Sequence, residues 1–382
     1  MRASLLLEGL SRRHSVSLAI LPVFGADSLS GDRSLARRLA AHTTTLPIAR
    51  QDDARRWVAE RLATPAGRRR LDAIHPLPSL CRLASREGVA ELRRTVERVA
   101  LVVVMRAYLM PALDFLLDEP RRPTVILDLD ELDSDVQRQL SHEQEAVRFE
   151  RLERHYLPRV DHVTVAAEPD ASILKERHRL ASVSTLINAV RPPAAVTEPA
   201  PPHDLLFVGN LAYAPNVEAA DWLCREVMPR LPDTTIALVG SSPGPAIAEL
   251  AESPGVTLAA DVADVTPWYD AARVAVAPLH SGGGTRTKIV EALLHGRPVV
   301  ATSVGARGLP TGGDAGVLIA DDPGAFARAC RALLDDPGQA AQLAAAGRRR
   351  LPSAEQVIAQ IDELVSRAVR DRPRPRLSHR AG

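Results

Sequence analysis

The chain has 382 residues, a formal net charge of +1 and a hydrophobic content of 46%, which is enough for two or three domains with their own cores. The near-neutral charge and the aromatic content of 3% argue against nucleic-acid binding, which needs basic surfaces and stacking side chains. The three cysteines form no CxxC pair or Cys/His cluster, so neither a zinc site nor a disulfide framework is expected. No apolar run reaches the length of a membrane span.

The first half of the chain alternates predicted strands with long, charged helical segments. It opens with a helix-like stretch rich in leucine at residues 5–10, and strands are predicted at 15–23, 100–108, 123–130 and 161–168, with helical segments at 134–157. A doubly wound domain normally starts with a strand and a glycine-rich turn. We therefore expect either that this first strand is missing or that the true start lies upstream.

The second half gives the clearer pattern. Strands are predicted at 204–210, 234–240, 255–261, 273–279, 297–303 and 315–321, and helices at 216–230, 244–252, 265–272, 286–295 and 323–335. Near-continuous apolar strands that alternate with helices predict a parallel sheet covered on both faces. This half is therefore interpreted as a doubly wound α/β domain. Five prolines within residues 189–203 predict a semi-rigid connector between the halves.

Two strand ends carry residues suited to a ligand, because open α/β sheets bind ligands at the carboxyl ends of their strands. In FVGNLAYAPN (207–216), Gly209 lets a ligand approach the backbone. The alternative is a plain turn in which Asn216 caps the next helix. In HSGGGT (280–285), small residues lead into the N-terminus of a helix, a combination that suits a diphosphate.

The helix after the glycines adds charges to this second site. Arg286 and Lys288 are predicted in its first turn, where cations oppose the helix dipole unless an anion balances them. Glu291 follows one turn later and is placed to accept the hydroxyls of a ribose. The alternative is a weak surface ion pair between Lys288 and Glu291. The glycines in front of the pair favour a ligand site. Lys288 is one of only two lysines, with Lys175, among 48 basic residues.

With these residues in place, the chain resembles the retaining GT-B glycosyltransferases of family 4. The resemblance rests on LLFVGNLAYAPN, PLHSGGGTRTKIVEALLHGRPVVAT and GVLIADDPGAFARACRALLDDP, and covers about residues 203–351. A weaker, colinear similarity over residues 1–190 includes ILDLDELDSD and LINAV. The resemblance implies an α/β fold of the GT-B type, with two Rossmann-like doubly wound domains that face a cleft.

The resemblance also implies a domain layout. The chain is expected to contain an N-terminal acceptor-side domain at 1–190, a Pro-rich linker at 191–203, a C-terminal donor domain at 204–351, a helix at 352–370 that packs back on the N-terminal domain, and a disordered tail at 371–382. Many members carry two glutamates eight positions apart. Here Gly283 stands at the first position and Glu291 at the second.

Site roles follow from the same resemblance. Arg286 and Lys288 are the expected catalytic residues, because they would stabilise the departing diphosphate. The expected donor-binding residues are Gly209 and Asn210 on one strand end, Gly283, Gly284 and Thr285 on the other, Glu291 at the ribose and Val262 near the nucleobase. No metal ion and no cofactor other than the donor are expected, since Arg and Lys can stabilise the leaving group. Asp128, Asp130 and Asp133 are interpreted either as part of an acceptor cleft or as a polar strand end with a helix cap.

The expected function is retaining transfer of a sugar from a nucleotide sugar to a glycan, lipid or small-molecule acceptor, as in polysaccharide biosynthesis. The protein is expected to be cytoplasmic, and a peripheral membrane contact at the inner face is left open; no nucleic-acid partner is expected. Two alternatives remain at this point. One is a non-catalytic GT-B partner subunit, and the other is a different GT-B enzyme such as a nucleotide-sugar epimerase.

Overall fold

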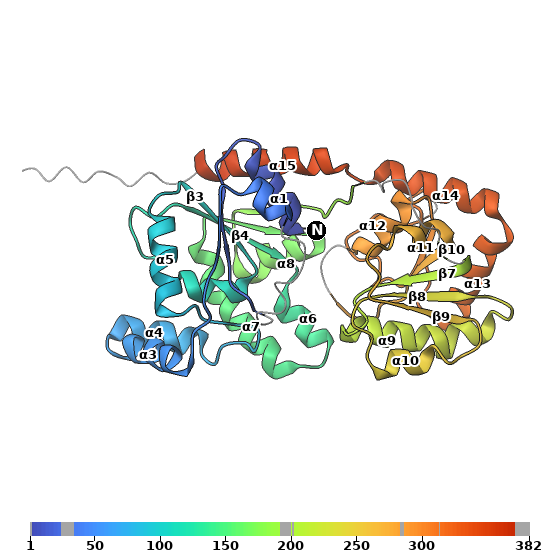
Figure 1. The fold of residues 1–382 in the computed structure, drawn as a ribbon, viewed down its shortest axis with the longest axis horizontal. Coiled ribbons are helices and arrows are strands. Elements are labelled where there is room, and N and C mark those ends of the chain that lie inside the picture. The colour runs from blue at the N-terminus through green and yellow to red at the C-terminus, as the bar shows by residue number, and fades with distance from the viewer. Residues whose placement is uncertain are drawn as a thin grey trace, which may run out of the picture. The chain divides into compact units, whose positions relative to one another are not determined.

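The computed structural model describes residues 2–23, 34–191, 200, 202–282, 286–312 and 314–370. The chain divides into two compact units, one made of Met1–Ile187 with Glu355–Gly382 and the other of Asn188–Ala354 (Figure 1). Several predicted features lie outside the described residues, namely Gly283, Gly284, Thr285, the tail and most of the linker. Among the described residues, no helix is both long and apolar enough to cross a bilayer.

The first unit is built on two parallel sheets. A four-stranded sheet has the order β3 (Leu101–Met105), β4 (Thr124–Asp130), β5 (His162–Val165), β6 (Val183–Thr185), and a two-stranded sheet pairs β1 (Ser17–Ile20) with β2 (His42–Thr45). Six of the seven residues of β4 are buried, as its apolar run requires. The helices are α1 (Arg2–Ser11), α2 (Ser34–Leu39), α3 (Gln51–Leu62), α4 (Pro65–Ile74), α5 (Arg86–Val96), α6 (Asp133–Gln139), α7 (Glu143–Tyr156), α8 (Glu168–His178) and α15 (Ala354–Arg370).

Helix α15 begins at the boundary of the second unit and continues into the first. It packs against α1, where Gly9 lies so close that an added Cβ would meet the side chain of Ile361 at 3.0 Å. Ion pairs join the same two helices, Arg12 to Glu355 at 2.6 Å and Arg13 to Asp362 at 3.0 Å. The first unit therefore contains residues from both ends of the described chain (Figure 1).

The second unit contains one parallel sheet of six strands. Their spatial order is β12 (Val317–Ile319), β11 (Val299–Ala301), β10 (Ala272–Ala277), β7 (His203–Val208), β8 (Ile236–Gly240), β9 (Val256–Ala260). This is the doubly wound arrangement predicted from the sequence. The chain runs outward from β7 in one direction and from β10 in the other, so the topological switch point lies between β7 and β10.

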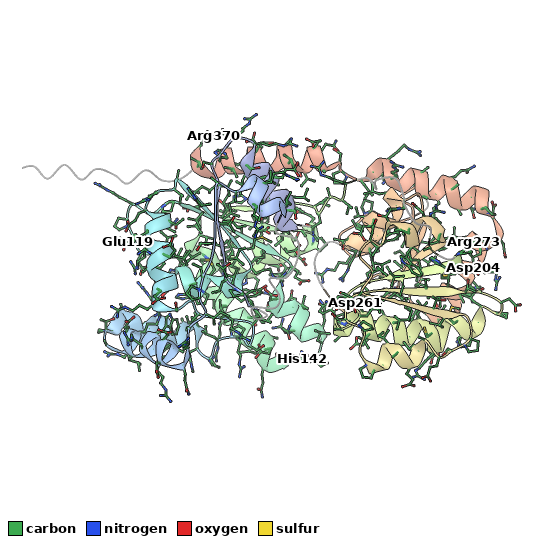
Figure 2. The ribbon with its side chains drawn as sticks, in the orientation of Figure 1. Glu119, His142, Asp204, Asp261, Arg273 and Arg370 are labelled. Carbon is green, nitrogen blue, oxygen red and sulfur yellow. The ribbon has the colours of Figure 1, made fainter. Side chains whose placement is uncertain are left out.

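Helices cover both faces of this sheet. One apolar cluster joins alternate strand residues such as Phe207 and Leu238 to α9 (Ala214–Trp222), α10 (Pro245–Leu250), α13 (Pro323–Asp335) and α14 (Pro337–Arg350). The other joins the intervening residues, such as Leu206 and Val239, to α11 (Thr266–Ala271) and α12 (Thr287–Leu294). Figure 2 shows Asp261 beyond the carboxyl ends of the strands, whereas Asp204 and Arg273 lie at the amino ends.

The structure corrects three sequence-based expectations in the second unit. The helix predicted over 216–230 is α9 followed by a π-helical turn (Leu223–Val227) and a 3-10 turn (Met228–Arg230). Asn216 is not the N-cap of α9, because Tyr213 holds that position and Asn216 is the third helical residue. Helix α12 begins at Thr287, which places Arg286 at its N-cap.

Candidate donor-binding site

The candidate site lies at the switch point, where β7 and β10 end side by side. Gly209 follows β7 and donates its backbone N–H to Val239 O at 3.0 Å. Its neighbour Asn210 is exposed, and its side chain accepts from Ala212 N at 2.9 Å. The predicted donor-binding positions after β7 therefore lie at the carboxyl-terminal end of the sheet, where a doubly wound domain binds its ligand.

Arg286 bonds to two backbone carbonyls, one after β10 and one after β11. Its guanidinium donates to Gly282 O at 2.7 Å and to Val304 O at 3.2 Å, and the residue is only 7% exposed. Gly282 has a φ of 107°, and a Cβ there would meet the Arg286 guanidinium at 3.0 Å. These contacts give Arg286 a structural task beside the catalytic role that the sequence predicts for it. That catalytic role stays a prediction.

The side chain of Lys288 spans the carboxyl-terminal end of the sheet. It extends from α12, on one face, to Phe207 and Asn216, which belong to the other face. The ammonium lies 4.1 Å from the centre of the Phe207 ring, a cation–π contact, and donates to Asn216 Oδ1 at 2.8 Å. Burial and, to a smaller extent, the positive charge of Arg286 lower the pKa of Lys288 to about 7, while the negative charge of Glu291 opposes the change.

Glu291 lies one turn beyond Lys288 and has a fixed orientation. The Tyr269 hydroxyl, on α11, is 3.1 Å from Glu291 Oε2 and 3.2 Å from Lys288 O. Tyr269 itself is 1% exposed and stacks on His295 with ring centroids 4.9 Å apart. Burial raises the pKa of Glu291, and the Tyr269 hydrogen bond and the Lys288 charge partly offset that rise.

The loops after β8 and β9 lie at the same carboxyl-terminal end of the sheet, beyond the turn after β7. Ser242 and Asp261 adopt left-handed backbone conformations, with φ of 55° and 52°, which are uncommon for such residues and occur often at binding sites. Ser242 N donates to Asp261 Oδ1 at 2.8 Å and so joins the two loops. Val262 follows, half-buried, and packs against the same apolar cluster as Tyr269.

The acidic residues of the first unit have partners within that unit. Asp128 is fully buried and accepts from Arg2 Nε at 2.7 Å and from Thr164 Oγ1 at 2.5 Å. Asp133 begins α6 and pairs with Arg106. For Asp128 these contacts favour the structural interpretation, since a carboxylate enclosed by an arginine and a threonine is not exposed to an acceptor.

The structure thus brings Lys288 and Glu291 together with Gly209 and Asn210 at the carboxyl-terminal end of the six-stranded sheet. Sequence reasoning missed the roles of Asn216, Phe207 and Tyr269. The side chain of Asn216 had a signal in the sequence, as a polar residue in the turn after a buried strand. Tyr269 and Phe207 had none, because each is buried in an apolar cluster and reaches the site only through the fold.

The comparisons with known proteins agree with this geometry. Residues 202–336 match the family model of the group 1 glycosyl transferases, and this segment includes the whole candidate site. The fold of the chain is GT-B, a class with two Rossmann-like units. No curated protein sequence matches the chain.

Solved structures are similar over most of the chain. Sucrose-phosphate synthase from Thermosynechococcus elongatus aligns with a TM-score of 0.65 and 16% identity, covering 92% of this chain and 98% of that one. HepE from Anabaena, solved with UDP and glucose, aligns with a TM-score of 0.63 and 14% identity, covering 96% and 95%. TarM aligns with a TM-score of 0.61 and 12% identity over 74% of this chain, and the match spans only 59% of TarM. At these identities the likeness establishes the fold.

Proposed function

We propose that this protein is a glycosyltransferase that moves a sugar from a nucleotide diphosphate sugar to a glycan, lipid or small-molecule acceptor, with retention of configuration. The observation that carries the proposal is the placement of the Lys288 ammonium and the Glu291 carboxylate on consecutive turns of α12, at the switch point of a doubly wound sheet. The group 1 match over 202–336 supports it, as do the UDP-containing structures of HepE and TarM.

The two side chains suit the two halves of a donor. Cleavage of the bond between the sugar and the diphosphate leaves negative charge on the diphosphate, and a fixed ammonium stabilises that charge without a metal ion. The N-terminus of α12 adds its dipole to the same end. Glu291 Oε2 already accepts from Tyr269, so we expect the ribose hydroxyls at Oε1. The acceptor oxygen then bonds to the anomeric carbon as the bond from that carbon to the diphosphate breaks, and the hydroxyl proton passes to the departing diphosphate.

The test is calorimetry of the purified full chain with UDP, GDP and ADP and their glucose conjugates, in EDTA. At least one nucleotide should bind without divalent metal, and a 2′,3′-dideoxy analogue should bind at least about tenfold more weakly, because Glu291 would lose two charge-assisted hydrogen bonds. Absence of binding by every nucleotide would overturn the proposal and favour a non-catalytic partner subunit.

Product analysis tests the reaction itself. Incubation of the bound nucleotide sugar with candidate acceptors should release a nucleoside diphosphate, and proton NMR of the new glycoside should show the anomeric configuration of the donor. Release of a free epimerised sugar or sugar nucleotide without glycoside formation would identify an epimerase instead.

A further inference from the structure

The carboxamide of Asn216 connects two helices across the candidate site. Its Oδ1 accepts from Lys288 Nζ at 2.8 Å, and its Nδ2 donates to Asn210 O at 2.8 Å. Asn216 is 7% exposed and lies in the first turn of α9, whereas Lys288 lies in the first turn of α12. Among the described residues, Asn216 is the side chain that accepts from this ammonium.

The surroundings fix the orientation of this carboxamide. A backbone carbonyl only accepts, so Asn210 O requires the amide nitrogen on its side and directs Oδ1 toward Lys288. Gly209 leaves the necessary room, because a Cβ at that position would lie 2.8 Å from Asn216 Nδ2 and 2.9 Å from its Cγ. The glycine after β7 therefore allows Asn216 to pack against the turn.

We propose that Asn216 is a positioning residue, which holds the Lys288 ammonium under the turn after β7 so that it meets the donor diphosphate. The inference rests on the proposed function. A lysine side chain has four rotatable bonds, and ordering it costs entropy. With one N–H directed to Asn216 and the Phe207 ring beneath it, the ammonium has its place before the ligand arrives and keeps donors for phosphate oxygens.

The neutral character of Asn216 is part of the argument. An aspartate at 216 would have the same shape but would neutralise the ammonium and compete with a bound anion. Asparagine orients the cation and leaves its charge for the ligand. Arg286 and Glu291 are the charged groups that act on Lys288, and neither changes in the variants below.

The experiment uses the fact that the chain contains only two lysines, Lys175 and Lys288. Labelling with [13Cε]lysine gives two NMR signals, and Lys175, with 47% of its side chain exposed, serves as the internal reference. The pKa of each lysine is measured in the wild type, Asn216→Asp and Asn216→Ala. Both variants lose the hydrogen bond from position 216 to Asn210 O. The difference in the pKa of Lys288 between them therefore reports the group at position 216 that faces Lys288.

We expect Asn216→Asp to raise the pKa of Lys288 by at least about one unit relative to Asn216→Ala, as an adjacent carboxylate does, while Lys175 is unchanged. Calorimetry on the same samples should show the nucleotide diphosphate that binds the wild type binding both variants at least about tenfold more weakly. Thermal melting identifies the variants that are folded.

The outcomes separate this inference from the proposed function. If the wild type binds no nucleotide, the proposed function fails, and the positioning role fails with it. If the wild type binds and both folded variants bind as tightly as the wild type, the positioning role is overturned while the donor site stands. The same holds if the pKa of Lys288 is identical in the two variants.

Discussion

The hydroxyl of Tyr269 lies 3.1 Å from Oε2 of Glu291 and 3.2 Å from the backbone oxygen of Lys288. One buried phenol on α11 thus contacts both functional positions of α12. The carboxylate that we assign to the ribose is held in place by a side chain that need not touch the ligand.

Tyr269→Phe should weaken nucleotide binding about fivefold, because the loss of a buried hydrogen bond costs about 1 kcal/mol. The ring and its stacking on His295 remain. The hydroxyl lowers the pKa of Glu291, so its removal should raise that pKa and weaken binding most at acidic pH, where Glu291 becomes protonated. Calorimetry between pH 5 and pH 8 checks this, and equal affinity of both proteins throughout would contradict it.

Donor binding should depend on the protonation of Lys288. Its pKa is about 7 in the free protein, and a bound diphosphate raises the pKa of an adjacent amine. The charged form is present below pH 7, so the affinity for a nucleotide sugar should be constant there and should fall as the pH rises above 7. A nucleotide sugar is the suitable probe, because its diphosphate diester has no proton to lose in this range.

Lys288→Arg should remove that pH dependence and lower donor affinity at pH 6.5 at least about tenfold, or about 1.4 kcal/mol. A guanidinium stays charged, but its planar fork is wider than the ammonium that lies 4.1 Å from the Phe207 ring centre and 2.8 Å from Asn216 Oδ1, so we expect it to lose these contacts. Lys175→Arg is the matched control, since Lys175 is exposed and pairs only loosely with Glu168. Equal donor affinity of the two variants would mean that Lys288 has no special role.

Glu153 should make the first unit less stable as the pH rises. Burial raises its pKa to about 8, whereas an unfolded glutamate titrates near about 4.3. Between these values the folded protein holds a proton that the unfolded chain releases. The contribution of this group is therefore fully present below about pH 4 and is lost as the pH rises through 8, with a slope of up to about 1.4 kcal/mol per pH unit.

Glu153→Gln should flatten this slope. Glutamine keeps the shape and can bond with Ser134, which now donates to the carboxyl group through its N–H at 3.1 Å and its hydroxyl at 2.7 Å. Urea unfolding at several pH values, followed by the fluorescence of Trp57 with Trp222 and Trp268 replaced by Phe, reports this unit. Glu150→Gln, on the same helix but in surface ion pairs, is the control and should keep the wild-type slope.

Gly240→Ala should destabilise the second unit by about 1–3 kcal/mol or prevent its folding. A Cβ at Gly240 would lie 1.6 Å from Gly209 O, so β8 and the turn after β7 would have to separate. Gly244→Ala is the control, because a Cβ there has no neighbour within 4 Å. Gly244 is the N-cap of α10, so this exchange should cost no more than about 1 kcal/mol. Thermal melting of both variants gives the comparison, and similar melting temperatures would contradict the expected clash.

Most strands could be predicted because they are buried on both faces and therefore apolar throughout. Strand β4 and strand β10 are examples. Strand β2 was missed because its sequence is HTTT and most of it is exposed, and β6 because it has three half-buried residues. Helix α14 was also missed, since its alanine-rich sequence gives little contrast between faces.

The candidate site divides along the same physical line. Lys288 and Glu291 could be predicted because a helix places residues three apart on one face. The contacts of Lys288 with Asn216 and of Glu291 with Tyr269 join residues 72 and 22 positions apart. Only the sheet order brings them together, and sequence periodicity carries no information about such pairs. Arg286 was predicted from its place at the start of a helix after the glycines and from the family resemblance, neither of which could reveal its two carbonyl partners.

The return of α15 to the first unit has a consequence for synthesis on the ribosome. The second unit is one uninterrupted stretch, so it can complete its fold while the first unit still lacks its last helix. The buried residues of α15 include Val357, Ile358 and Ile361, and until they emerge α1 lacks the contact of Gly9 with Ile361. We therefore expect the domain that is translated first to be the one that matures last, and nascent chains to depend on chaperones at their N-terminal end.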